Sequence, residues 1–170
     1  AEAFVDFAAK YEKERKDRKS VFKSQMTGWC KFLLENGISQ IVCQYEGSGD
    51  SGCIENIYFF KEYDEGRDMW RSGADPDELT EEEVNKLELP AELKQHHWVH
   101  QEEGPAKWEV PEGSQKVTDA YDCWVSEALP DGFEINEGGY GKIDFNTKEI
   151  RLEVEDNRRI IDVETETYEI

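Results

Sequence analysis

The sequence predicts an α+β protein with a mostly antiparallel sheet, two main helices on one face of that sheet, and an acidic insert. Apolar residues recur every three or four positions near the start of the chain and again at 114–129, as in helices that pack along one side. The strand-like segments at the end of the chain follow one another through short polar connections, which favours antiparallel pairing. A length of 170 residues fits a single domain, 1–170.

Residues 1–36 are expected to form the first helix. This stretch contains no proline, and its first glycine is Gly28. Its packing face is marked by apolar residues at helical spacing, namely Phe22, Met26, Trp29 and Leu33. The nearly all-charged run Glu12–Ser20 is expected to be solvated, and Asn36-Gly37 is a common helix stop.

Two strands and the acidic insert follow. Ile38–Tyr45 and Ile54–Phe60 are rich in β-branched and aromatic residues and are expected to be strands. Residues 61–111 form the insert or long connection, which holds most of the prolines and a dense acidic run. Within it, Thr80 followed by Glu83 is a capping-box pattern that predicts a short helix over Glu81–Leu89.

The remainder of the chain is expected to form one more helix and three more strands. Ser114–Leu129 carries an apolar stripe of Val117, Tyr121, Trp124, Val125 and Leu129. Tyr140–Phe145 and Ile150–Val154 alternate and are joined by a short polar turn, as in a hairpin. Apolar and polar residues also alternate over Ile160–Tyr168, which predicts a last strand with one solvent-exposed face.

The charge excludes several classes of function. The chain carries 40 Asp or Glu against 20 Lys or Arg, a net charge of −20. Nucleic acids and anionic membranes require a positive protein surface, so direct binding to either is not expected. No apolar run approaches the length of about 18 residues that a membrane span needs. We therefore expect a cytoplasmic protein, and its acidity favours a basic protein as its partner.

The densest special segment is Glu46–Glu55, Glu-Gly-Ser-Gly-Asp-Ser-Gly-Cys-Ile-Glu, which lies between two expected strands. Three interpretations compete: a carboxylate cluster for Ca²⁺ or Mg²⁺, an acidic contact surface, and turn geometry alone. Two similar clusters follow at Phe133–Gly141 and Glu153–Arg159, with Arg158 as an internal counter-ion. In an antiparallel sheet these turns would converge at one edge. The candidate binding residues are Glu46, Ser48, Asp50, Ser51, Glu55, Glu134, Asn136, Glu137, Tyr140, Asn157 and Arg158.

Two of these motifs carry a resemblance to a known family. Gly-Ser-Gly-Asp-Ser-Gly-x-Ile-Glu and Glu-x-Asn-x-Gly-x-Tyr-Gly, in this order, resemble an uncharacterised domain-of-unknown-function family found in bacteria, plasmids and phages. The resemblance covers about residues 25–60 and 114–165. It implies ancestry in a mobile element and supplies no activity.

Three functions remain open. The first is a non-enzymatic acidic binding protein. More specifically, it could be a phage or mobile-element inhibitor that mimics nucleic acid and binds a basic protein that handles nucleic acid. The second is a divalent-metal-dependent enzyme built from the carboxylates Glu46, Asp50, Glu55, Glu134 and Glu137. The third is an accessory subunit that docks through Glu12–Lys23, and homo-oligomers are compatible with it. We assign no catalytic residue and no cofactor. A divalent cation would be the cofactor under the second hypothesis.

Overall fold

The computed structural model describes residues 2–49, 51–67, 75–110, 113–129 and 138–160. Within these ranges, a five-stranded antiparallel sheet has the strand order β3-β2-β1-β6-β7. Its strands are β1 Gln40–Ser48, β2 Ser51–Phe60, β3 Glu78–Leu79, β6 Gly139–Asn146 and β7 Arg151–Arg158. The sheet and its helices make an α+β fold, which confirms the predicted class.

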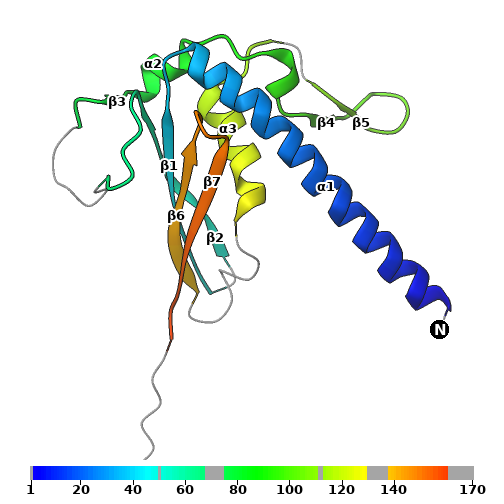
Figure 1. The fold of residues 1–170 in the computed structure, drawn as a ribbon. Helices are drawn as coiled ribbons and strands as arrows, with labels where there is room; N and C mark the ends of the chain where they lie inside the picture. Colours follow the sequence, from blue (N-terminus) through cyan, green and yellow to red (C-terminus); the bar gives the residue numbers. More distant parts are fainter. Residues whose placement is uncertain (1, 50, 68–74, 111–112, 130–137, 161–170) are drawn as a thin grey trace, which may run out of the picture.

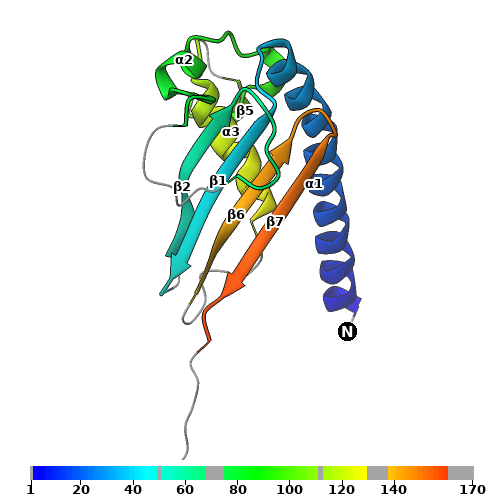
Figure 2. The ribbon, with the colours of Figure 1, turned by 60° about the vertical axis from the view of Figure 1, so that its left-hand side comes forward.

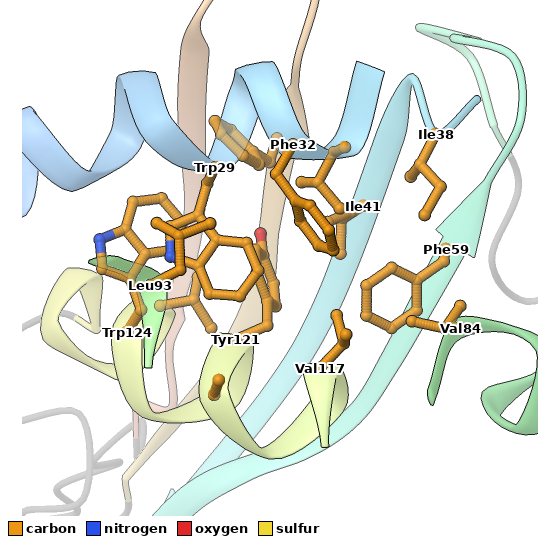
Figure 3. Close-up of a cluster of buried hydrophobic side chains, with 14 of the residues drawn as sticks. Trp29, Phe32, Ile38, Ile41, Phe59, Val84, Leu93, Val117, Tyr121 and Trp124 are labelled. Carbon is orange, nitrogen blue, oxygen red and sulfur yellow. The ribbon is translucent and has the colours of Figure 1, made fainter. Parts of the chain in front are cut away.

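Two helices cover one face of the sheet, and the core lies between them and the strands (Figure 1). These are α1, Glu2–Glu35, and α3, Val117–Val125. Figure 3 shows the side chains that meet there, with Trp29 from α1 against Tyr121 and Trp124 from α3. The ring centroids of Trp29 and Tyr121 lie 5.3 Å apart, nearly perpendicular to each other. Because all three rings are buried, this aromatic group fixes how α1 and α3 sit on the sheet.

Only the second half of α1 packs against the body. Phe22, Met26, Trp29 and Leu33 contact the core, as their spacing predicts. Side chains 5–21 are all exposed, and this part of the helix projects away from the rest of the chain (Figures 1 and 2). We call residues 2–21 the arm. The charged run at 12–20 is therefore solvated, as expected, and Gly37 ends the helix region with a positive φ of 74°.

The insert contains several short elements. They are α2 Glu81–Asn85, the 3-10 helix η1 Ala91–Leu93, and the strands β4 His97–Val99 and β5 Lys107–Glu109, which form a separate hairpin. The predicted capping box is present, since Thr80 Oγ1 accepts from the Glu83 amide and Glu83 accepts from the Thr80 amide. The helix is shorter than predicted, since it ends at Asn85 with Lys86 as its C-cap.

The start of the insert folds back over the face of the sheet that no described helix covers. We call residues 61–67 the strap. Its Arg67 guanidinium lies 3.8 Å above the Phe60 ring and pairs with Asp75 and Asp77. Buried Gln40 of β1 holds the strap, since it accepts from the Asp64 amide and from Arg67 Nε and donates to the Asp64 carbonyl. The strap thus closes one end of this open face and leads the chain into β3.

Other boundaries differ from the predictions. The helix predicted over Ser114–Leu129 is α3, which begins at Val117 and continues into the 3-10 helix η2, Ser126–Ala128. The hairpin β6-β7 is present and longer than predicted. The predicted strand Ile160–Tyr168 lies outside the described residues apart from Ile160, which is not in a strand. No helix in the described part of the chain has the length and apolar character needed to cross a membrane.

Candidate functional site

The strand register brings the sequence motifs together at one end of the sheet. Gly47 of β1 pairs with Gly52 of β2 on one side and with Gly139 of β6 on the other. Gly139 in turn pairs with Arg158 of β7. The ends of four strands therefore lie side by side, far from the strap. The expectation that these turns converge at one edge of an antiparallel sheet agrees with this register.

The segment 46–55, expected to be a connection between strands, is mostly strand. Glu46–Ser48 ends β1 and Ser51–Glu55 begins β2, and Ser48 pairs with Ser51. Gly49 has a φ of 57°, which suits glycine in a tight hairpin turn. Opposite this hairpin, a Cβ on Gly138 would lie 1.7 Å from the Gly47 carbonyl oxygen. The absence of a side chain at Gly138 thus allows the chain there to approach Gly47 closely.

The charged groups at this end are paired with one another. Arg159 donates to Glu46 and to the Gly47 carbonyl, and its guanidinium lies 5.5 Å from the centre of the Tyr140 ring. Arg158 pairs with Asp156 at 2.8 Å. Asp156 also accepts from the Tyr45 hydroxyl at 2.7 Å. Burial and this hydrogen bond both raise the pKa of Tyr45, which stays a protonated donor at neutral pH.

A groove of about 720 Å³ lies on the open face between this end of the sheet and the strap. Figure 2 shows the strands β2, β1, β6 and β7 that underlie this open-face groove. Its lining side chains are polar and come from all four strands and the strap, namely Gln44, Glu46, Glu55, Asn56, Arg67, Tyr140, Lys142, Glu155, Asn157 and Arg159.

Positive and negative charges balance in the open-face groove. Its described lining holds three carboxylates and three cations, and most of these charges are paired. Lys142 lies 3.7 Å from Glu155, and Arg159 pairs with Glu46. Paired carboxylates attract a basic partner less than free ones do, because the counter-ion cancels their field. The groove is therefore suited to a polar ligand rather than to a strongly basic protein.

A second groove, of about 360 Å³, lies beside the edge strand β2 and faces α3. We call it the edge groove. Its apolar lining comes from Ile54, Ile57, Tyr58, Phe59 and Leu79. β3 pairs only with Phe59 and Phe60, so the outer edge of β2 from residue 51 to 58 has no strand partner among the described residues. An open strand edge beside a concave surface is a common site for protein contacts.

The edge groove differs from the open-face groove in its charge. Its described lining contains five carboxylates, Glu55, Glu78, Glu81, Asp119 and Asp122, and no Lys or Arg. Burial, followed by the nearby charge of Asp75, raises the pKa of Glu78. The charge of Arg67 partly offsets this rise. A cationic side chain placed in the groove would supply a counter-ion that its described lining lacks.

The structure distributes the predicted site residues over different surroundings. Glu46, Glu55, Tyr140 and Asn157 line the open-face groove. Ser48 and Ser51 are exposed at the hairpin, and Arg158 binds Asp156. Arg158 thus pairs within the cluster in which it was expected as a counter-ion, and Arg159 adds a second pair, with Glu46. Asp50, Glu134, Asn136 and Glu137 lie outside the described residues.

Sequence reasoning missed the main members of the edge groove. Asp119 and Asp122 are spaced i, i+3 on α3, away from its buried residues Tyr121 and Trp124, and this polar stripe was the available signal. Glu78 and Glu81 flank Thr80, whose capping role was recognised while the groove was not. Only Glu55 belongs to both the predicted site and the edge groove.

The described residues contain no group of three or more His, Cys, Asp or Glu side chains arranged to hold a metal ion. Three of the five carboxylates proposed for a metal enzyme, Asp50, Glu134 and Glu137, lie outside the described residues. The other two, Glu46 and Glu55, line the open-face groove, where Glu46 forms an ion pair with Arg159. The metal interpretation stays a prediction.

The fold and the two grooves define an α+β protein with helices on one face of an antiparallel sheet and polar grooves on its other face and at its edge. The model of a family of unknown function, DUF6878, matches residues 22–170, and the chain belongs to this family. The match begins at Phe22, where α1 starts to pack on the body. Neither the curated proteins nor the solved structures give a match.

Proposed function

We propose that the protein is a non-enzymatic binding protein that presents an acidic surface to a basic protein partner. The observation that carries this proposal is the edge groove, whose described lining holds five carboxylates and no cation beside an open strand edge. The net charge of −20 adds a long-range field that draws a basic partner toward this surface. The groove then supplies the local contacts that a general field lacks.

The apolar residues of the edge groove support a protein partner in particular. Ile54, Ile57 and Leu79 are half-buried between the carboxylates. A segment that carries both Lys or Arg and apolar side chains would match this pattern, with its cations against Asp119 and Asp122. Desolvated apolar contacts supply affinity, while the charges supply specificity and rate of association.

The sharper form of the proposal concerns the identity of the partner. A basic protein that handles nucleic acid has a surface built to hold phosphates, and carboxylates can take their place on it. The protein would then act as an inhibitor and nucleic-acid mimic, which fits the ancestry in a mobile element that the sequence motifs imply. The support for this form is the charge of −20 within 170 residues.

Titration of a fluorescein-labelled Lys/Arg-rich peptide tests the proposal. The groove variant is Glu81→Gln/Asp119→Asn/Asp122→Asn, and the control is Glu102→Gln/Glu103→Gln/Glu109→Gln, which removes three exposed charges outside the groove. We expect the groove variant to weaken binding at least roughly tenfold and the control less than about twofold, because local charges act far more strongly than screened ones. Equal weakening in both variants would show that only the net charge matters.

The open-face groove favours a second candidate function, the binding of a small polar ligand. Its volume of about 720 Å³ falls within the range of ligand pockets, about 300–1,000 Å³. Its amides and its balanced charges suit a molecule that bears both signs of charge. Thermal-shift screening of zwitterionic metabolites against wild type and Asn157→Leu tests this function: a stabilising compound should lose its effect in the variant.

A further inference from the structure

The packing face of α1 continues beyond the body of the protein. On the body, this face consists of Phe22, Met26, Trp29 and Leu33. The same three- and four-residue spacing continues toward the N-terminus through Arg18, Arg15, Tyr11 and Phe7. These four side chains are exposed, Phe7 by 70% and Tyr11 by 53%. The arm therefore presents two aromatic rings and two arginines on the same side of α1 that packs against the core farther along the helix.

The arm and the rest of the chain have opposite charge. Residues 2–21, the arm, carry six Lys or Arg against five Asp or Glu, with all six cations and only three of the acids within residues 10–19. All other residues together carry 14 Lys or Arg against 35 Asp or Glu. The body of a second copy is therefore a surface of the charge that the cations of the arm require.

Geometry prevents the arm from reaching the body of its own chain. α1 is one continuous helix from Glu2 to Glu35, and its C-terminal half is fixed against the core. The arm consequently points away from the sheet (Figures 1 and 2). A straight helix of 20 residues extends about 30 Å, so this distance separates the arm's first residue from the packed half. Among the described residues, none covers the side chains of residues 5–21.

The edge groove has the complementary surface. Its carboxylates, Asp119 and Asp122 among them, suit Arg15 and Arg18, and its apolar residues, such as Ile54, suit Tyr11 and Phe7. We propose that the arm of one copy binds the edge groove of a second copy, and that two chains exchange their arms reciprocally in a symmetric dimer. This inference rests on the proposed function in one respect, namely that the edge groove accepts basic segments.

Pairing of two arms with each other is disfavoured. In a parallel pair in register, Arg15 and Arg18 would face the same residues of the partner helix, and like charges at a helix seam destabilise it. The arm–groove dimer also has a functional consequence. The arm competes with a basic partner for the same surface, so the dimer holds the groove occupied and the monomer offers it free.

Analytical ultracentrifugation of the full chain from about 5 to 200 µM tests the proposal, because assembly depends on concentration. We expect a dimer that dissociates at high salt. The arm variant Tyr11→Ser/Arg15→Glu/Arg18→Glu and the groove variant Glu81→Gln/Asp119→Asn/Asp122→Asn should each be monomeric. The control Lys13→Glu/Lys16→Glu alters the opposite side of the arm and should still dimerise. A mixture of arm and groove variants should form a heterodimer, since one intact arm and one intact groove remain.

A wild-type chain that stays monomeric over this range would overturn the inference, and so would a groove variant that dimerises as the wild type does. Peptide titration of the arm variant separates this failure from that of the proposed function. If the wild type is monomeric and the peptide still needs Asp119 and Asp122, the proposed function stands and the dimer is refuted. If the groove-dependent dimer forms and the arm variant binds no basic peptide, the dimer stands and the proposed function is refuted.

Discussion

Replacement of Gln40 by methionine should destabilise the protein strongly. Gln40 is fully buried, and its amide bonds to both oxygens of Asp144, to the backbone of Asp64 and to Arg67 Nε, over distances of 2.9–3.2 Å. Methionine keeps the length of the side chain and removes all of these bonds. At about 1 kcal/mol for each partner left without its bond, and more for a charged one, we expect a loss of about 3–5 kcal/mol.

Urea denaturation followed by tryptophan fluorescence measures this loss, because Trp29 and Trp124 are buried in the core. Gln44→Met is the matched control, on the same strand and face, where the glutamine makes one long bond of 3.3 Å to Asn56. The control should lie within about 1 kcal/mol of wild type. Equal stability of the two variants would refute the conclusion that Gln40 anchors the strap. Since the strap leads into β3, loss of this anchor should also weaken peptide binding in the edge groove.

Three further predictions concern stability. Burial raises the pKa of Asp144, so the folded protein binds a proton at this carboxyl more tightly than the unfolded chain does. The stability of Asp144→Asn relative to wild type should therefore fall as the pH is lowered from 7 toward 4. A stability difference that is independent of pH would contradict this. Gly141→Ala should lower the free energy of unfolding by about 3 kcal/mol or more, because its Cβ would lie 1.9 Å from the Glu155 carbonyl oxygen. The control Gly66→Ala places its Cβ no closer than 3.8 Å to any atom and should be nearly neutral in the same urea assay. Thr80→Ala removes the cap of α2 and should cost about 1 kcal/mol, and an unchanged urea midpoint would contradict the capping role.

The helices and most strands follow from local pattern. The spacing of Phe22, Met26, Trp29 and Leu33 already marks the side of α1 that packs, since helical period alone decides which residues share a face. The capping box at Thr80 is likewise local, because its partners are three residues apart. Boundaries were less predictable where the sequence alternates weakly. Glycine and serine in the segment 46–55 suggest a loop, although pairing with β6 extends β1 through Gly47 and pairing with β2 extends it through Ser48.

The site depended on contacts between distant parts of the chain. The register that pairs Gln40 with Asn146, and Gly47 with Gly139, joins residues about a hundred positions apart, and nothing local specifies it. Arg159 neutralises Glu46 only because of this register. The edge groove likewise forms only when α3 lies beside β2. Composition predicted an acidic surface, while its place at Asp119 and Asp122 required the packing of α3.

The most direct test of the central claim is a comparative pull-down from the cells in which the protein occurs, with low- and high-salt washes and identification by mass spectrometry. Wild type, the groove variant and the control at Glu102, Glu103 and Glu109 serve as baits in parallel. We predict that wild type and the control capture the same basic protein, that high salt releases it, and that the groove variant does not capture it. Equal capture by all three baits, or capture of no basic protein by the wild type, would contradict the claim that the edge groove holds a basic partner.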